Sequence, residues 1–283
     1  MLTYATAHRE LVTTLRTIYD AREASAIANE VLEQLTGADR LQRLADKDRL
    51  LDEDQAKRFR DMQTELASGK PVQYVLGFGW FMGKKFIVNE QVLIPRPETE
   101  ELVQWIADEH KGKTPSVLDI GTGSGCIPVS LKLLMPGADI SAIDISAGAL
   151  GVAKKNAEEQ CAEVRFMQLN FLDKDAWQGL GKYDVIVSNP PYISEPERAT
   201  LHANVRDFEP GQALFVPGHD ALLFYRHIAA FGLTHLQPGG AIYCELHVDY
   251  ALQTRDLFLA AGYPATEVRK DMHGNMRMLK AIK

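Results

Sequence analysis

The fold of this protein is indicated by the stretch Val117-Leu118-Asp119-Ile120-Gly121-Thr122-Gly123-Ser124-Gly125. Its first four residues form a short apolar run that predicts a buried strand, and the segment Cys126–Leu134 after it has a helical pattern. Glycines between a strand and a helix let the backbone approach a ligand closely, and the N-terminus of the helix presents unpaired N–H groups. The stretch therefore predicts a ligand-binding turn at the end of a strand in an α/β sheet.

A carboxylate after the next apolar run supports this prediction. Asp144 follows the run Ile140–Ile143, roughly twenty residues beyond the glycines, where a carboxylate can accept hydrogen bonds from both ribose hydroxyls of a nucleoside. A P-loop is excluded because no Gly-Lys-Ser/Thr follows. The glycines at 121, 123 and 125 follow the order Gly-x-Gly-x-Gly, which differs from the Gly-x-Gly-x-x-Gly that accommodates a pyrophosphate. The turn and Asp144 therefore predict a nucleoside cofactor, and the glycine spacing alone leaves its identity open.

The chain from Val117 onward alternates between predicted strands and helices. The apolar runs that predict strands are Val117–Ile120, Ile140–Ile143, Val164–Gln168, Val185–Val187 and Ile242–Cys244. The segments that predict helices are Cys126–Leu134, Ala147–Gln160, Asp220–Leu236 and Tyr250–Ala261. The tail predicts two more strands joined by a hairpin, Glu267–Arg269 and Met276–Ala281, with an antiparallel edge strand. We expect a doubly wound, mostly parallel seven-stranded sheet with helices on both faces.

The N-terminal part of the chain has a different pattern. Leu11, Leu15 and Ile18 recur at helical spacing, and residues 1–71 as a whole predict a small helical bundle, for which we expect a role in recognising a partner protein. Residues 72–94 are rich in aromatic and β-branched residues broken by glycines, which predicts a linking β-hairpin. The expected domains are thus 1–71, the hairpin 72–94 and the α/β domain 95–283.

The candidate chemistry lies in Asn189-Pro190-Pro191-Tyr192, which follows the predicted fourth strand. Ligands of doubly wound folds bind at the carboxyl ends of the strands, so we expect this loop beside the glycine turn. A planar amide or aromatic amino nitrogen is a poor nucleophile because its lone pair is delocalised. The Asn189 side-chain carbonyl and the Pro190 backbone carbonyl can each accept one of its N–H groups and favour the positive charge that develops. Tyr192 offers a flat face for stacking, and no ionised base is required.

These motifs resemble those of one enzyme class. The glycine turn resembles motif I of the class I S-adenosylmethionine-dependent methyltransferases. Asn-Pro-Pro-Tyr is shared by methyltransferases that act on planar nitrogen, in nucleic-acid bases or in glutamine amides of proteins. The segments Pro71–Gly77 (PVQYVLG) and Leu93–Glu100 (LIPRPETE) resemble the signature of the release factor glutamine methyltransferases, and Val205–Pro210 (VRDFEP) fits the same family. The resemblance covers nearly the whole chain.

The resemblance implies methyl transfer from S-adenosylmethionine to the side-chain amide of the glutamine in the Gly-Gly-Gln loop of bacterial peptide chain release factors. The residues that it implies for cofactor binding are Asp119, Gly121, Thr122, Gly123, Ser124, Gly125, Asp144, Asn170, Phe171 and Asn189. The residues that it implies for substrate binding are Asn189, Pro190, Pro191 and Tyr192, of which Asn189, Pro190 and Tyr192 are the catalytic candidates. Phe171 would contact adenine, although a lone phenylalanine is more often a core residue.

The sequence departs from the family pattern at two places. Asn170 stands where many relatives have an acidic residue, and Glu245-Leu246-His247 stands where relatives often have a glycine near the third position. We expect His247 to be a loop residue rather than a base. Arg96 and Glu98 match the family, and two roles stay open for them: a salt-bridged strut or direct contact with substrate.

Three other functions compete with this one. An adenine or guanine amino methyltransferase would use Asn-Pro-Pro-Tyr alone and would show nuclease-sensitive methyl acceptance. A non-catalytic binding protein would keep the fold as a scaffold and would bind no S-adenosylmethionine. A nicotinamide oxidoreductase would explain the glycine turn but leaves the Asn-Pro-Pro-Tyr loop without a task.

The composition sets further limits. With 31 Lys and Arg against 38 Asp and Glu among 283 residues, the net charge is −7. This charge argues against a protein that binds a long duplex mainly through its phosphates, and it leaves a local basic groove open. The three cysteines lack metal-ligand or disulfide spacing, so we expect no metal. The N-terminus resembles no secretory signal, and no run reaches the roughly 18 apolar residues of a membrane helix. We expect a cytoplasmic monomer without membrane contact.

Overall fold

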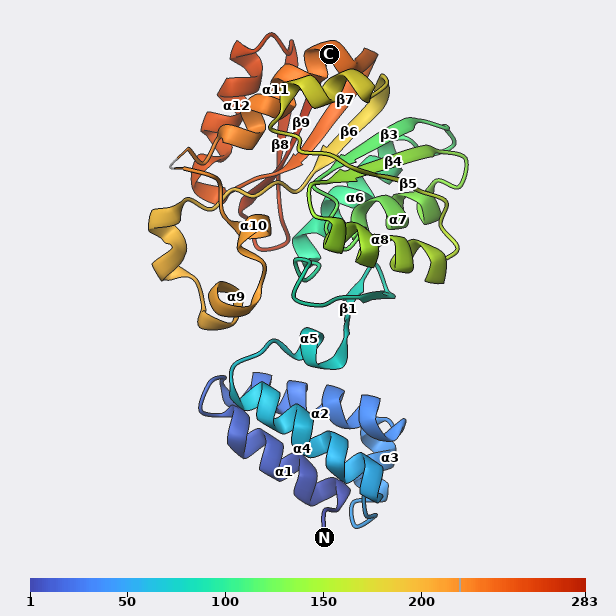
Figure 1. Ribbon diagram of the computed structural model, residues 1–283, viewed down its shortest axis with the longest axis vertical. Coiled ribbons are helices and arrows are strands. Elements are labelled where there is room, and N and C mark those ends of the chain that lie inside the picture. Colours follow the sequence, from blue (N-terminus) through green and yellow to red (C-terminus); the bar gives the residue numbers. More distant parts are fainter. Residues whose placement is uncertain (219) are drawn as a thin grey trace. The chain divides into compact units, whose positions relative to one another are not determined.

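The computed structural model describes residues 1–218 and 220–283 and divides them into two compact units (Figure 1). The first is Met1–Phe78 together with His202–Phe208, and the second is Gly79–Leu201 together with Glu209–Lys283. We call them the helical unit and the α/β unit. Each has its own hydrophobic core.

The helical unit is built from short amphipathic helices. Their bounds are α1 Tyr4–Leu15, α2 Ala21–Thr36, α3 Arg40–Ala45, α4 Glu53–Ala67, α5 Val72–Leu76 and α9 Ala203–Phe208. Leu11 and Leu15 are fully buried, as their helical spacing predicts. Asp20 and Asp52 cap α2 and α4 by accepting hydrogen bonds from backbone N–H groups of the first turns, a contact that contributes about 1 kcal/mol per helix.

The predicted hairpin is shorter than the segment 72–94. Residues 72–76 form α5, so the prediction of a strand there is wrong, and the hairpin strands are β1 Phe78–Phe81 and β2 Lys84–Ile87. Helix α5 follows Pro71 and ends at Gly77, which adopts the left-handed conformation with φ 79°. Aromatic and β-branched residues do not distinguish a single helical turn from a strand of the same length. The chain after β2 contains no strand up to residue 94.

A seven-stranded sheet forms the centre of the α/β unit. Its strands are β3 Ser116–Ile120, β4 Asp139–Asp144, β5 Arg165–Gln168, β6 Tyr183–Ser188, β7 Leu236–Glu245, β8 Ala265–Lys270 and β9 Met276–Ile282. They lie in the order β5-β4-β3-β6-β7-β9-β8, and β9 runs antiparallel to β7 and β8, whereas the other adjacent pairs are parallel. The expected mostly parallel sheet of seven strands is confirmed.

The strand order reverses between β3 and β6, and this reversal locates the site. From β3 the chain proceeds outward through β4 and β5, then returns to place β6 on the other side of β3. Ile120 pairs with Ser188, so the residues that follow these two strands begin at the same level of the sheet. Such a switch point opens a crevice at the carboxyl ends of the strands, where ligands of α/β proteins bind.

Helices cover both faces of this sheet (Figure 1). One face carries α6 Pro97–Glu109, α7 Cys126–Leu134 and α8 Ala147–Glu159, and the other carries α11 Leu223–His235 and α12 Ala251–Ala260. Short elements in the connections are η1 Lys174–Gly179, η2 Glu195–Thr200, α10 Gly211–Leu214 and η3 Val248–Tyr250. Because helices cover both faces, the central strands are mostly apolar, as in Val117–Leu118 of β3 and Val185–Val187 of β6. No helix in the described residues combines the length and the apolar character that a membrane crossing requires.

Helix α6 was not expected from the sequence. It begins with Pro97, whose fixed φ suits the first turn of a helix and whose missing N–H would be unpaired there anyway. Its buried face, which includes Leu102 and Ile106, packs in the core beside α7. This helix brings Thr99, on its first turn, behind the Asn-Pro-Pro-Tyr loop.

Candidate functional site

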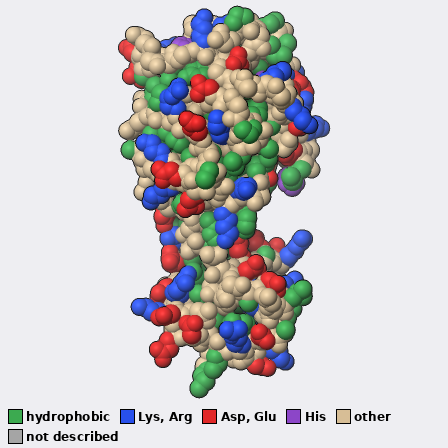
Figure 2. Space-filling model, turned by 90° about the vertical axis from the view of Figure 1, so that its right-hand side faces the viewer, with side chains coloured by type: hydrophobic (Ala, Val, Ile, Leu, Met, Phe, Trp, Pro, Cys, Tyr) green, Lys and Arg blue, Asp and Glu red, His purple; other side chains and the backbone are tan. Residues whose placement is uncertain are grey.

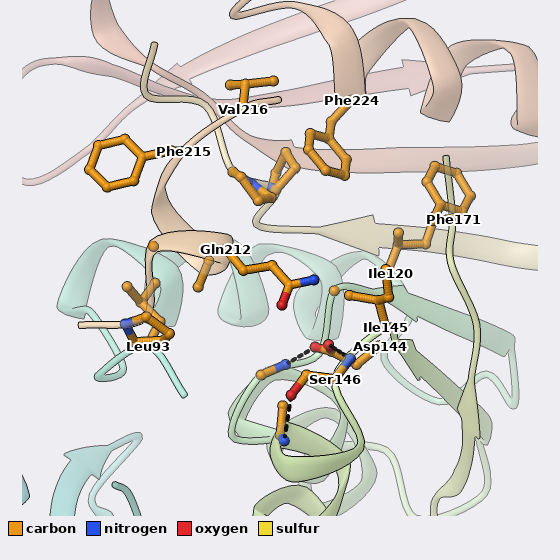
Figure 3. A pocket seen from close by; sticks show the side chains of 18 of the residues that line it. Leu93, Ile120, Asp144, Ile145, Ser146, Phe171, Gln212, Phe215, Val216 and Phe224 are labelled. Carbon is orange, nitrogen blue, oxygen red and sulfur yellow. Dashed lines mark hydrogen bonds between the residues drawn. The ribbon is translucent and has the colours of Figure 1, made fainter. Parts of the chain in front are cut away.

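The carboxyl ends of β3, β4 and β6 and the chain beyond β5 surround a cavity of about 960 Å³ (Figure 3). This volume lies near the upper end of the usual range for small-molecule sites. The candidate residues that line it are Gly121, Gly123, Asp144, Asn170, Phe171, Asn189, Pro190 and Pro191. The candidates that do not line it are Asp119, Thr122, Ser124, Gly125 and Tyr192. The structure thus brings the glycine turn and the first three residues of the Asn-Pro-Pro-Tyr loop to one space.

The glycine turn follows β3 with three residues in the left-handed region. Gly121, Gly123 and Gly125 have φ values of 76°, 55° and 78°. A Cβ at Gly121 or Gly123 would meet no atom within 4 Å, so backbone conformation alone requires glycine there. A Cβ at Gly125 would lie 3.0 Å from the Cβ of Ala153, so this glycine also permits close packing of the turn against α8.

Asp144 ties the glycine turn to the end of β4. Its Oδ2 accepts the Gly123 N–H at 2.9 Å, and its Oδ1 accepts the Ser146 N–H at 2.9 Å (Figure 3). Burial raises the pKa of this carboxyl, and the backbone N–H donors oppose that shift. Because each carboxylate oxygen has a second lone pair, Asp144 can still accept hydrogen bonds from a ligand in the cavity.

Behind the turn lie buried polar atoms without partners. Asp119 is fully buried, and neither its two carboxyl oxygens nor the hydroxyl of Thr122 has a hydrogen-bond partner among the described residues. Burial raises the pKa of Asp119 to about 7. An unpartnered buried carboxyl is costly in an apolar setting, so its presence two residues before Gly121 suits a ligand that brings a donor or a positive charge.

The far wall of the cavity is aromatic. Figure 3 shows Phe171 at the opposite end of the cavity from Leu93 and Phe215. The Phe171 ring stacks on Trp177 at 5.5 Å between centroids and meets Phe231 edge-on at 5.4 Å, so it belongs to the core as well as to the cavity wall. Asn170 is exposed, and its Oδ1 accepts the Leu172 N–H at 3.1 Å.

Several residues of the cavity wall were missed by the sequence reasoning. They lie before α6, between β6 and α11, and on the first turn of α11, and they include Leu93, Arg198, Gln212, Phe215, Val216 and Phe224. Figure 3 shows the Gln212 amide directed into the cavity toward Asp144. Residues of loops and single short turns follow no helical or strand period, so the sequence pattern did not indicate them. The helical pattern over Asp220–Leu236 did not indicate that Phe224 lines a cavity.

The Asn-Pro-Pro-Tyr loop is held from behind by hydrogen bonds. Asn189 Nδ2 donates to Thr99 Oγ1 at 3.2 Å, and Thr99 Oγ1 donates to Glu245 Oε2 at 2.5 Å. The Tyr192 hydroxyl donates to Glu245 Oε1 at 3.3 Å. Tyr192 thus directs its polar end to Glu245, and burial together with the Glu245 charge raises the pKa of its phenol. Sequence spacing offered no signal for these partners.

Arg96, which matches the family pattern, and His247, which departs from it, both make structural contacts. Arg96 Nη2 lies 2.5 Å from Glu209 Oε1, and the other Glu209 oxygen accepts the Ile94 N–H at 3.2 Å. Of the two roles left open for Arg96, the structure shows the salt bridge. His247 lies in a loop, as expected, with Nε2 at 2.9 Å from Glu197 Oε2.

The α/β sheet, its switch point and the motif loops together define a class I methyltransferase fold. A methyltransferase from Pyrococcus furiosus matches with a TM-score of 0.53 and 18% identity, covering 79% of this chain and 98% of that chain. A human methyltransferase 10 domain containing protein matches with a TM-score of 0.51 and 20% identity, covering 71% of this chain and 90% of that one. Both likenesses concern the fold.

Sequence comparisons identify the family. The model of the methyltransferase small domain matches residues 97–210, and that of the PrmC N-terminal domain matches residues 6–77. A release factor glutamine methyltransferase from Flavobacterium psychrophilum is 38% identical over 96% of this chain and 96% of its own length. One from Bacteroides thetaiotaomicron is 41% identical over 94% and 95%. The chain belongs to the release factor glutamine methyltransferase family.

Proposed function

We propose that this protein transfers a methyl group from S-adenosylmethionine to the side-chain amide nitrogen of the glutamine in the Gly-Gly-Gln motif of peptide chain release factors. One observation carries the proposal. The glycine turn with Asp144 and the Asn189–Pro191 loop line the same cavity, so a nucleoside cofactor and a planar amide can meet there. We call the part lined by Gly121, Gly123, Asp144 and Phe171 the cofactor half, and the part lined by Asn189–Pro191 the substrate half.

The residues of the cofactor half fit S-adenosylmethionine. Asp144 would accept hydrogen bonds from the ribose hydroxyls, and Phe171, which lines the cavity, would contact the adenine. The unpartnered Asp119 carboxyl suits the ammonium group of the methionine part, reached directly or through a water. When bound, S-adenosylmethionine supplies an electrophilic methyl group and leaves as S-adenosylhomocysteine.

The residues of the substrate half would orient the amide of the substrate. The Asn189 Oδ1 and the Pro190 carbonyl oxygen each accept one hydrogen of the glutamine –NH₂ group, which directs its nitrogen at the methyl group. As that nitrogen gains positive charge, the two carbonyl dipoles stabilise it. The apolar walls, which include Ile120, Val92 and Phe215, exclude water and so strengthen these interactions. The extra proton leaves to water after transfer.

We further propose that the helical unit recognises the body of the release factor. All residues that line the cavity belong to the α/β unit, so the helical unit is free for another role. It contains a second cavity of about 480 Å³ whose cationic lining residues are Arg9, Arg16, Arg40, Arg43 and Lys47. Such a site suits an acidic segment of a protein partner. This substrate places the enzyme in the cytoplasm, where translation takes place.

Labelled S-adenosylmethionine tests the proposed function. The purified protein is incubated with the labelled cofactor and a release factor, with a Gln→Ala release factor as the matched control. We expect label in the first release factor and none in the second. Equal labelling of both would contradict the proposed function.

The same experiment distinguishes the proposed function from the alternative, methylation of an adenine or guanine amino group in nucleic acid. A base methyltransferase would label an acceptor that RNase or DNase destroys, whereas we expect labelling to survive both nucleases. On the face drawn in Figure 2, Lys and Arg side chains are interspersed with Asp and Glu rather than gathered in one basic area. That face therefore offers no continuous surface for a phosphate backbone.

A further inference from the structure

Two buried polar residues lie behind the catalytic loop without lining the cavity. Thr99 comes from the first turn of α6, and Glu245 is the last residue of β7. Each is only 2% exposed. A buried carboxyl requires compensation, and Glu245 receives it from the hydroxyls of Thr99 and Tyr192. The Glu245 backbone oxygen is also engaged, since it accepts the Tyr225 hydroxyl at 2.9 Å.

The hydrogen bonds of this cluster can run in one direction only. An ionised carboxylate accepts hydrogen bonds and cannot donate them, so Thr99 must donate its single hydroxyl hydrogen to Glu245. The Thr99 oxygen can then only accept from Asn189, which requires the –NH₂ side of the Asn189 amide to face it. The Asn189 Oδ1 is consequently turned away from Thr99.

The direction matters because the two faces of an amide have opposite hydrogen-bonding character. A substrate amide –NH₂ needs acceptors in order to be oriented. If the Asn189 side chain were flipped, its own –NH₂ would meet the substrate –NH₂, two donors would face each other, and the oriented complex would be lost.

We propose that Thr99 and Glu245 are positioning residues, and that the ionised Glu245, acting through Thr99, holds the Asn189 carbonyl oxygen toward the substrate amide. This inference rests on the proposed function and deepens it. Neither residue needs to touch the substrate or the cofactor.

The charges around Glu245 favour this direction at neutral pH. Arg277 on β9 is the cation that stabilises the ionised form, whereas Glu98 on α6 opposes it. Burial raises the pKa of Glu245, and the hydrogen bonds from Thr99 and Tyr192 lower it again. When the pH falls through this raised pKa, the protonated carboxyl can donate to Thr99, and the chain of bonds to Asn189 can reverse.

Variants of Thr99 test the positioning role. Thr99→Val removes the hydroxyl with little change in shape, and Thr99→Ser keeps it as a matched control. We expect Thr99→Val to lower kcat by about 10- to 100-fold, since misorientation of a catalytic group by about 1 Å can cost 100-fold. In Thr99→Val the Kd for S-adenosylmethionine, measured by calorimetry, should stay within about twofold of the wild-type value because the cofactor half is unchanged. Thr99→Ser should retain most of the wild-type kcat.

The contradicting results are equally specific. Wild-type kcat in Thr99→Val would overturn the proposal. So would a Thr99→Ser variant as slow as Thr99→Val, because the hydroxyl would then not be the feature that matters. Unfolding temperatures of both variants show whether a loss of kcat reflects loss of the fold. If Thr99→Val is unfolded, the kcat values of Thr99→Ser and Glu245→Gln test the positioning role instead.

Glu245→Gln removes the fixed direction of the hydrogen bonds to Thr99 and keeps the size of the side chain. A glutamine amide can either accept from Thr99 or donate to it, so both orientations of Asn189 become populated. For the wild type we expect kcat to decline toward acid pH as Glu245 is protonated. For Glu245→Gln we expect a lower kcat and no such decline. A wild-type kcat with an unchanged pH profile would overturn the proposal. If the wild-type enzyme itself does not label the release factor glutamine, the proposed function fails instead, so the two failures are distinguishable.

Discussion

In the cofactor half of the cavity, the Asp144 carboxylate bonds backbone N–H groups that lie 21 and 2 residues away in the chain. In the substrate half, Asn189 bonds Thr99, 90 residues away, and Thr99 bonds Glu245, 146 residues away. The cofactor half is thus assembled from one strand–turn–helix unit and its neighbouring strand. The substrate half depends on the packing of α6 against β7, so a change far from the cavity can disturb its chemistry.

The comparison predicts that the two halves fail in different ways. Damage to the cofactor half should weaken cofactor binding, whereas damage to the substrate half should slow the chemical step at full cofactor occupancy.

The largest effect is expected for Asn189→Ala. The substrate amide loses its side-chain acceptor, and turnover should fall by at least about 100-fold because the lost interaction acts in the transition state. S-adenosylmethionine affinity should stay within about tenfold, as calorimetry can measure. Near-normal turnover would remove Asn189 from its assigned role and break the comparison.

Asp144→Ala should show the opposite signature. The variant loses the acceptor for the ribose hydroxyls and also releases the Gly123 N–H, so we expect the Kd for S-adenosylmethionine to rise about 10- to 100-fold. At saturating cofactor, kcat should stay close to that of the wild type. An unchanged Kd in the same titration would count against the ribose contact.

Asp119→Asn should have a smaller effect, with opposite signs for stability and binding. Since the pKa of Asp119 is raised to about 7, the folded protein without cofactor holds a proton that the unfolded chain releases above its ordinary pKa. The free energy of unfolding that Asp119 contributes therefore falls as the pH rises from about 4 to about 7. We expect the variant to be more stable than the wild type at pH 8 but to bind S-adenosylmethionine several-fold more weakly there.

Denaturant titration and calorimetry at pH 6 and pH 8 check this prediction. Wild-type affinity for the cofactor should increase between these two values, as Asp119 ionises, and the affinity of Asp119→Asn should change less. Equal affinities of both proteins at both pH values would show that Asp119 does not face the ligand.

A pair of glycine variants gives the smallest expected effect and probes the turn without removing a polar group. Gly125→Ala adds a Cβ at φ 78° and 3.0 Å from Ala153, so it should lower the free energy of unfolding by about 1–2 kcal/mol. Gly151→Ala, within α8 and without neighbours in reach of the new Cβ, should raise it by up to about 1 kcal/mol. The unfolding midpoints in urea measure both, and equal shifts of the two variants would refute the role given to Gly125.

The contrast between the locally assembled cofactor half and the substrate half explains what could be predicted from the sequence. The strands and the glycine turn follow from local patterns, and Asp144 follows from the distance to the glycines. The fold class and these parts of the cofactor half could therefore be predicted, whereas the strand order with its switch point comes from the structure. The part that Thr99 and Glu245 play could not. A contact across 146 residues leaves no periodic signal, and α6, which carries Thr99, was not expected.

Two other differences have equally local causes. The segment after Pro71 forms one helical turn before the hairpin. Gly77 ends this turn in the left-handed conformation, which is typical of a helix C-terminus. Tyr192 was expected as a stacking face for the substrate, yet it does not line the cavity, and its hydroxyl bonds Glu245. A side chain with an apolar ring and a polar end can either stack on a substrate or donate a hydrogen bond in the interior. The position of its hydrogen-bond partner determines which of these it does.

The central claim is that the substrate half methylates one glutamine amide, and site-resolved mass spectrometry of the release factor tests it most directly. The factor is incubated with S-adenosylmethionine and either the wild-type protein or Asn189→Ala, then digested and sequenced. We predict one added methyl group on the Gly-Gly-Gln glutamine with the wild type, and an unmodified peptide with the variant. A methyl group on any other residue, or an equally methylated glutamine in both reactions, would contradict the account.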